Sequence, residues 1–125
     1  MTRGRGFTLI ELLVVLAIIA TLLTIAVPRY FTHVERAKEA TLRETLSVVR
    51  ESIDKFHADT GRFPDELEEL VTKRYLRKIP VDPVTGSAEG WVVVPVPNTA
   101  IPGKIYDIKS GAPGNGQDGT PYAEW

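Results

Sequence analysis

Hydrophobic side chains are concentrated near the start of the chain, in one run over residues 7–27. A helix of about 20 apolar residues is long enough to cross a lipid bilayer, so this run predicts a membrane-spanning helix. Glu11 is the only charged residue within it. A carboxylate inside a membrane segment costs roughly 3 kcal/mol, and residues of this kind usually have a function. Glu11 is therefore the first candidate functional residue.

After this run, hydrophobic residues recur at intervals of three and four, which indicates one buried helix face. The positions on this face are Val34, Ala37, Leu42, Leu46, Val49, Ile53 and Phe56. Together with the apolar run, they predict one helix from about Leu9 to about Ala58, roughly 75 Å long at 1.5 Å per residue. Pro28 lies inside this helix and predicts a kink, which membrane helices tolerate more readily than soluble ones.

The remaining residues, 59–125, are polar and rich in Gly and Pro, and they predict a small globular head. The sequence DTGRFP ends the long helix, because Gly and Pro interrupt helices. A short second helix is expected from Glu66 to about Lys73. Asp65 and Glu68 are spaced as a capping box at its start.

Two later segments have the composition of short strands. Residues 91–96 are β-branched and aromatic, and residues 104–109 alternate polar with apolar side chains. We expect them to pair antiparallel and to cover the amphipathic half of the long helix, which makes the fold class α+β. Residues 110–125 are too polar for an element of their own, and Tyr122 and Trp125 are expected to hold this tail to the sheet.

Composition limits the possible functions. A chain of 125 residues with a net charge of −1 has no overall basic field that would indicate nucleic-acid binding. It contains no Cys, which excludes a disulfide framework and a thiolate metal site. His33 and His57 lie far apart on one helix and cannot share a metal ion or relay a proton. The sequence has no serine-nucleophile elbow or phosphate-binding loop, and we expect no enzymatic activity.

The segment before the apolar run, residues 1–6, is a basic leader that contains Arg3 and Arg5. By the positive-inside rule, these charges keep the N-terminus in the cytoplasm while the rest of the chain crosses the membrane. An ordinary secretory signal has an apolar core of about 7–15 residues and a small-residue cleavage site. The run here is longer, and the sequence IAVP at its end is a poor cleavage site. These features favour a retained anchor over a cleaved signal peptide.

The first 28 residues resemble the N-terminal signature of type IV pilin-like proteins. That signature is a short basic leader ending in Gly6, then Phe7, a carboxylate four residues further on at Glu11, and Pro28. The head is similar, with less specific motifs, to the major pseudopilins of type II secretion systems. This second resemblance rests on GRFP at 61–64, IPVDP at 79–83, YDIKSG at 106–111 and a final loop that closes on Trp125.

The resemblance implies a filament subunit with a pilin-like fold. Its parts are a leader (1–6), a transmembrane and polymerisation helix (7–28), the amphipathic half of the same helix (29–58) and a periplasmic head with a C-terminal loop (59–125). A membrane prepilin peptidase would cut between Gly6 and Phe7 and methylate the new Phe7 amine. Subunits would wait in the bacterial inner membrane, N-terminus cytoplasmic, and then form a helical homopolymer in the periplasm. Minor pseudopilins and an inner-membrane assembly platform would be partners, and the filament would help to export folded proteins across the outer membrane.

The residues themselves give Glu11 a physical role in such a filament. Cleavage before Phe7 creates an α-amine about 6 Å from Glu11 along a straight helix, and a neighbour's amine, shifted along the axis, can come closer. A lone carboxylate among apolar helices is costly, and an opposite charge relieves that cost only with good geometry. We therefore expect Glu11 to set the axial register between subunits. The alternative is an acid that is tolerated near the membrane surface.

The resemblance also implies a calcium ion in the C-terminal loop. Calcium takes about 6–8 oxygen ligands. The candidates here are Asp118, Ser110 and Asp107, with loop carbonyls and Glu124 nearby. Where the family often has an acidic residue after the first turn, this chain has the sequence GAPG. The alternative is a Gly/Pro loop that is held by turns and aromatic side chains alone.

Two other functions remain open. A surface pilin or competence pseudopilin would form filaments for adhesion, motility or DNA uptake, although many surface pilins staple a C-terminal loop with a disulfide that this chain cannot form. Only residues 73–78 approach the basic cluster that DNA binding needs, so no nucleic-acid partner is expected. The third possibility is a signal-anchored periplasmic domain that never polymerises, and Phe7 followed by Glu11 argues against it.

Overall fold

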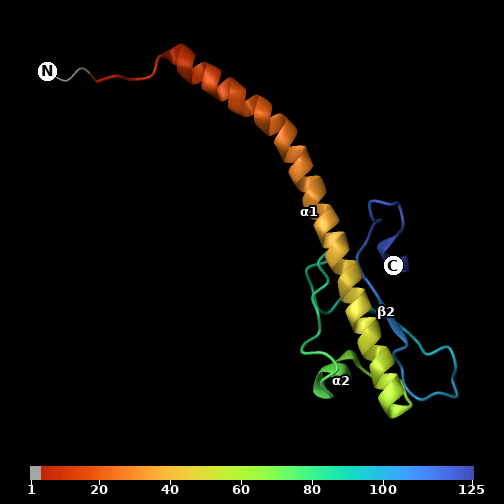
Figure 1. The fold of residues 1–125 in the computed structure, drawn as a ribbon. Helices are drawn as coiled ribbons and strands as arrows, with labels where there is room; N and C mark the ends of the chain where they lie inside the picture. The colour runs from red at the N-terminus through yellow and green to blue at the C-terminus, as the bar shows by residue number, and fades with distance from the viewer. Residues whose placement is uncertain (1–3) are drawn as a thin grey trace. The chain divides into compact units, whose positions relative to one another are not determined.

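The computed structural model describes residues 4–125, so the first part of the predicted leader, with Arg3, lies outside the described residues. In chain order, the elements are helix α1 (Leu9–Thr60), helix α2 (Leu67–Thr72), strands β1 (Val92–Val94) and β2 (Asp107–Lys109), and a 3₁₀ helix η1 (Tyr122–Glu124) (Figure 1). The predicted α+β class is confirmed. The chain divides into two compact units, one that ends at Glu35 and one that runs from Arg36 to Trp125.

The first unit consists mainly of the apolar half of α1. The helix continues through Pro28 and begins at the predicted residue, Leu9. Threonine hydroxyls in this part are bonded within the helix: Thr21 and Thr24 donate to the carbonyls four residues earlier, at 2.8 Å each. Such internal bonds are needed where no water can reach the side chain. By length and composition, α1 is the one candidate membrane span among the described residues.

The second unit buries one face of α1 against the head. The predicted positions from Leu42 onward are confirmed, since five of them are almost fully buried: Leu42, Leu46, Val49, Ile53 and Phe56. They join Phe63, Leu70, Ile105, Ile108, Ala112 and Tyr122 in one core cluster. Ala37 is exposed and Val34 is only half-buried. The buried face of α1 therefore begins at Leu42, later than the spacing predicted.

The two strands form an antiparallel pair, as predicted, with Val92 opposite Lys109 and Val94 opposite Asp107. Each has three residues, half the predicted length. Pro95 follows β1 directly and has no N–H to donate to a ladder, which ends the strand there. Ile108 of β2 is fully buried in the cluster with the α1 residues, so the sheet covers the amphipathic half of the helix as expected (Figure 1).

The expected capping box of α2 is wrong. The helix begins at Leu67, and its N-cap residue, Glu66, makes no side-chain capping bond. Glu69, not Glu68, reaches back, and its carboxylate accepts the backbone N–H of Asp65 at 3.0 Å. Because the helix starts one residue later than expected, the third helical position is occupied by Glu69. Its carboxylate also forms an ion pair with Arg62.

The ion pair between Glu69 and Arg62 predicts that the stability of the head falls on acidification. The hydrogen bond from Arg62 and the backbone bond from Asp65 lower the pKa of Glu69, and the charge of Lys73 adds to this effect. A carboxyl whose pKa is lower in the folded state contributes stability above its ordinary pKa, and this contribution is lost as the pH falls through the folded value. We expect Glu69→Gln to reduce the loss of stability on acidification.

The measurement is the urea midpoint of unfolding between neutral pH and pH 3, and Glu68→Gln is the matched control because Glu68 is exposed on the same helix. Equal acid dependence in the Glu69→Gln variant and the wild type would contradict this assignment.

Candidate processing and assembly site

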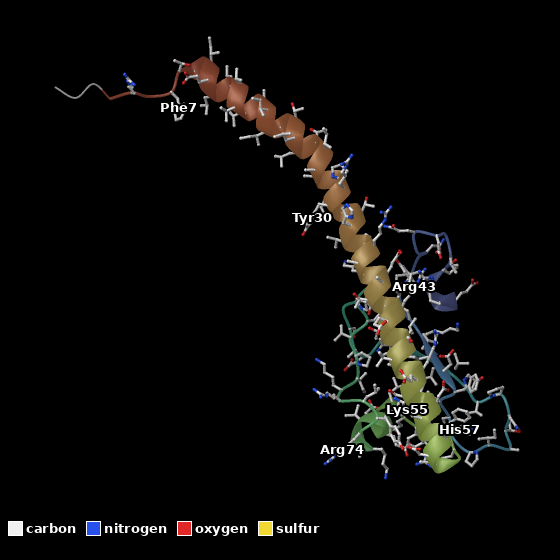
Figure 2. The ribbon with its side chains drawn as sticks, in the orientation of Figure 1. Phe7, Tyr30, Arg43, Lys55, His57 and Arg74 are labelled. Carbon is white, nitrogen blue, oxygen red and sulfur yellow. The ribbon has the colours of Figure 1, made fainter. Side chains whose placement is uncertain are left out.

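The Gly6–Phe7 peptide bond lies in an open segment before α1. Both residues are exposed, and Phe7 has 87% of its surface accessible. Figure 2 labels Phe7 in the segment before the helix. A Cβ placed on Gly6 would meet no atom within 4 Å. A peptidase needs an accessible, non-helical bond, and residues 4–8 carry no helix. The structure therefore leaves the predicted cleavage bond accessible.

Glu11 and Thr8 cap the start of α1 reciprocally. The Thr8 N–H donates to Oε2 of Glu11 at 3.2 Å, and the Glu11 N–H donates to Oγ1 of Thr8 at 3.1 Å. The Leu12 N–H then donates to the Thr8 carbonyl at 3.1 Å. This is a capping box, in which Thr and a Glu three residues later satisfy each other's free N–H groups. The carboxylate also lies at the helix N-terminus, where negative charge is favoured.

Thr8 was not among the residues expected to act at this site. The T-x-x-E spacing of Thr8 and Glu11 is the sequence signal that identifies it. Since α1 begins at Leu9, Phe7 is not on the helix, and the distance of about 6 Å along a helix axis does not apply to the uncut chain. Consecutive residues lie about 3.8 Å apart. The amine that cleavage would create is thus one residue away from the N–H that Glu11 binds.

The apolar half of α1 exposes its side chains in this single chain. Residues 9–27 are all exposed, among them Leu9, Ile10, Leu13, Leu22 and Ile25. An apolar surface of this extent needs lipid or other apolar helices around it. A shallow groove on it is lined by Val14, Ala17, Ile18, Thr21 and Leu22. The small residues Ala17 and Thr21, four apart, allow another helix to approach closely.

The three residues expected to bind calcium have other partners. The Asp107 carboxylate accepts from Arg50 Nε at 2.7 Å. The buried Ser110 hydroxyl donates to Asp82, and the Asp118 carboxylate accepts from the Thr120 N–H at 2.9 Å.

Calcium takes about 6–8 oxygen ligands, and a cation already beside a carboxylate opposes its binding there. Within residues 4–125, no group of three or more His, Asp or Glu side chains is placed to hold a metal ion. In this arrangement, Asp107 and Asp118 each lie beside a guanidinium, of Arg50 and Arg43, and Ser110 is bonded to Asp82.

The tail differs from the expectation that it forms no element. Residues 122–124 form η1, and Tyr122 is buried. The Tyr122 hydroxyl donates to Glu39 Oε1 at 3.1 Å, and the Trp125 ring lies under Arg43. Both aromatic residues therefore contact α1, whereas we expected them to attach the tail to the sheet.

Comparison with known proteins gives a match to one family profile and matches to several relatives. The profile described as "Prokaryotic N-terminal methylation motif" matches residues 1–27. The type II secretion system core protein G of Pseudomonas aeruginosa is 28% identical over an alignment of 132 positions. This alignment covers 93% of this chain and 90% of that protein. The protein of the same name from Klebsiella michiganensis is 29% identical over an alignment of 133 positions, which covers 94% of this chain and 86% of that protein.

The type IV major pilin protein PilA of Myxococcus xanthus is 35% identical over 68 residues, which cover 54% of this chain and 31% of that pilin. The match thus spans about a third of that relative's length. No solved structure matches the chain. These similarities confirm the resemblance that the first 28 residues and the head motifs predicted.

Proposed function

We propose, on the premise that this chain is a pilin-like protein similar over most of its length to core protein G, that it is the major pseudopilin of a type II secretion system. In this role it is a structural subunit that polymerises through α1 and helps to export folded proteins across the outer membrane. The observation that carries the proposal is the exposed Gly6–Phe7 bond placed directly before an apolar helix whose first turn contains Glu11. The proposed role is structural and uses no catalytic residue.

Processing is the first step of this function. A prepilin peptidase cuts after Gly6 and methylates the amine of Phe7, and the basic leader keeps this end on the cytoplasmic side of the inner membrane. The mature subunit then crosses the membrane once, with residues 59–125 in the periplasm. The open Gly6–Phe7 segment and the match to a methylation motif support this step.

Assembly is the second step, and Glu11 controls it. When apolar helices leave the membrane and stack, each Glu11 carboxylate enters an apolar surrounding, where an unpaired charge is strongly unfavourable. The Phe7 amine of an adjoining subunit supplies the opposite charge and fixes the axial register. Minor pseudopilins and the inner-membrane assembly platform take part in this step, and the product is a helical homopolymer.

Processing can be tested by mass spectrometry of the membrane-extracted protein. We expect the wild type to begin with Phe7 carrying one added methyl group. Gly6→Val places a β-branched side chain next to the scissile bond and should leave the leader attached. Gly4→Val is the matched control, because a Cβ at Gly4 also meets no atom within 4 Å but lies two residues from the bond. A wild-type protein that keeps Met1 in cells with an active peptidase would refute the proposed function.

The similarity to a type IV major pilin supports a second candidate, a surface filament for adhesion, motility or DNA uptake. Deleting the gene in its own host separates the two functions. We expect secreted proteins to accumulate in the periplasm while surface filaments, twitching and transformation stay normal. Normal secretion with lost surface filaments or lost transformation would favour the second candidate instead.

A further inference from the structure

Three arginines lie at seven-residue intervals on the part of α1 that belongs to the second unit. They are Arg36, Arg43 and Arg50, here called the arginine row. Seven residues make nearly two helical turns, so the three side chains lie on one face, about 10 Å apart along the axis. Every one of them contacts β2 or the C-terminal loop, defined here as residues 110–125.

Arg50 makes the most extensive contacts. Its Nε donates to Asp107 Oδ1 at 2.7 Å, and its Nη2 donates to the carbonyl of Ile108 at 3.1 Å and to the main-chain oxygen of Trp125 at 2.8 Å. The side chains of Arg50 and Asp107 are 35% and 26% exposed, so water screens their attraction only partly. One guanidinium thus joins α1, β2 and the last residue of the loop.

Arg43, seven residues before Arg50 on α1, contacts the same loop. Its Nη2 lies 3.4 Å from Asp118 Oδ2, and its Cζ lies 4.4 Å from the centre of the Trp125 ring. A guanidinium over an indole face is a favourable cation–π contact. The hydrogen bond from the Thr120 backbone N–H, together with the charge of Arg43, lowers the pKa of Asp118. The carboxylate is therefore held in its charged form.

Arg36 completes the row, and Glu39 adds bonds beside it. Arg36 Nε donates to Oε1 of Gln117 at 3.0 Å. Glu39 Oε1 accepts the backbone N–H of Gln117 at 2.8 Å and the hydroxyl of Tyr122 at 3.1 Å. The loop is thus attached along its length, although Ala112 and Tyr122 are its only residues in the buried hydrophobic cluster.

We propose that the arginine row holds the C-terminal loop against α1 without a metal ion. The two acidic candidates for calcium, Asp107 and Asp118, are each compensated by a guanidinium of the row. A calcium ion at these oxygens would have to displace the guanidinium groups and bind close to positive charge, which is unfavourable. The arginine row holds the loop in place, as a bound ion would in a metal-dependent loop. This role does not depend on the proposed filament function.

The test is hydrogen exchange of residues 110–125 in the full-length protein in detergent micelles, together with thermal unfolding. For the wild type, exchange and melting temperature should be the same in calcium chloride and in chelator. Arg50→Gln should accelerate exchange in this segment by about tenfold or more, because bonds to a charged donor are lost. Arg43→Gln should have a smaller effect in the same segment, since Arg43 and Asp118 are more exposed.

Lys55→Gln is the matched control, because Lys55 forms an exposed ion pair with Glu51 on the same helix, and it should leave exchange in residues 110–125 unchanged. If Arg50→Gln does not fold, the exposed Arg36→Gln and Arg43→Gln variants supply the comparison. Slower exchange or a higher melting temperature of the wild type in calcium would overturn the proposal in favour of a metal-held loop. Unchanged exchange in the folded arginine variants would also overturn it.

Discussion

Replacing Glu11 with alanine is expected to leave the subunit folded and inserted in the membrane but to stop filament assembly. Glu11 contacts Thr8 at the start of α1, and the core of the head begins at Leu42. Loss of the cap therefore weakens the first turn by about 0.5–2 kcal/mol and leaves the head intact. Assembly, by contrast, loses the charge that would meet the amine of an adjoining Phe7.

Two further variants separate capping from charge pairing. Glu11→Gln keeps a side chain that can complete a capping box but removes the negative charge. Thr8→Ala removes the reciprocal bond but keeps the carboxylate. If the charge drives assembly, Glu11→Gln should fail like Glu11→Ala, and Thr8→Ala should still assemble.

Filament yield after overproduction with the assembly genes is the measurement, and membrane fractionation checks insertion. Normal filaments from Glu11→Ala would refute the role in assembly. Normal filaments from Glu11→Gln alone would reduce Glu11 to a helix cap.

Replacing Gly111 with alanine is expected to destabilise the head severely. A Cβ at Gly111 would lie 2.0 Å from the carbonyl oxygen of Gly90 and 3.2 Å from its carbonyl carbon. Both contacts are with backbone, so no side chain can rotate away and one of the two loops must move. Such overpacking typically costs about 1–3 kcal/mol, and we expect the upper end or more because Gly111 follows the buried Ser110.

The partner glycine in this contact supplies the control. A Cβ at Gly90 has its nearest heavy atom at 3.8 Å, the Thr85 Oγ1, which is an ordinary contact distance. Gly90→Ala should therefore unfold at nearly the same urea concentration as the wild type. Equal stability of the two alanine variants would show that the contact between Gly111 and Gly90 does not limit the packing of the head.

The sequence predicts well what depends on local pattern. The start of α1 follows from the apolar run and its end from the Gly and Pro that come next. The strand pair follows from the β-branched residues of one segment and the alternation of the other. The start of α2 is off by one residue, because three neighbouring acids, Glu66, Glu68 and Glu69, each resemble a capping residue in sequence. Only the ion pair with Arg62 selects Glu69.

Long-range polar contacts escape this kind of prediction. Each member of the arginine row looks in sequence like a solvent-exposed charge on a helix, although the seven-residue interval is visible. Its partners lie 57 to 81 residues away, beyond any local pattern. The short tail helix η1 is missed for the same reason, since Tyr122 is buried by a contact with Glu39 on α1. The Thr8 cap is different, because its T-x-x-E signal is local and could have been found in the sequence.

The reciprocal cap has a consequence for the timing of polymerisation. In the unprocessed precursor, the acid is already bonded to its own chain, and the amide nitrogen of Phe7 carries no positive charge. If the proposed function holds, an uncut chain therefore lacks the Phe7 α-amine that would meet the Glu11 carboxylate of a neighbouring subunit. Cleavage before Phe7 would create this amine beside the capped acid, and each group could then pair with a neighbouring subunit. We expect the peptidase to act as a checkpoint, which keeps immature subunits from associating prematurely.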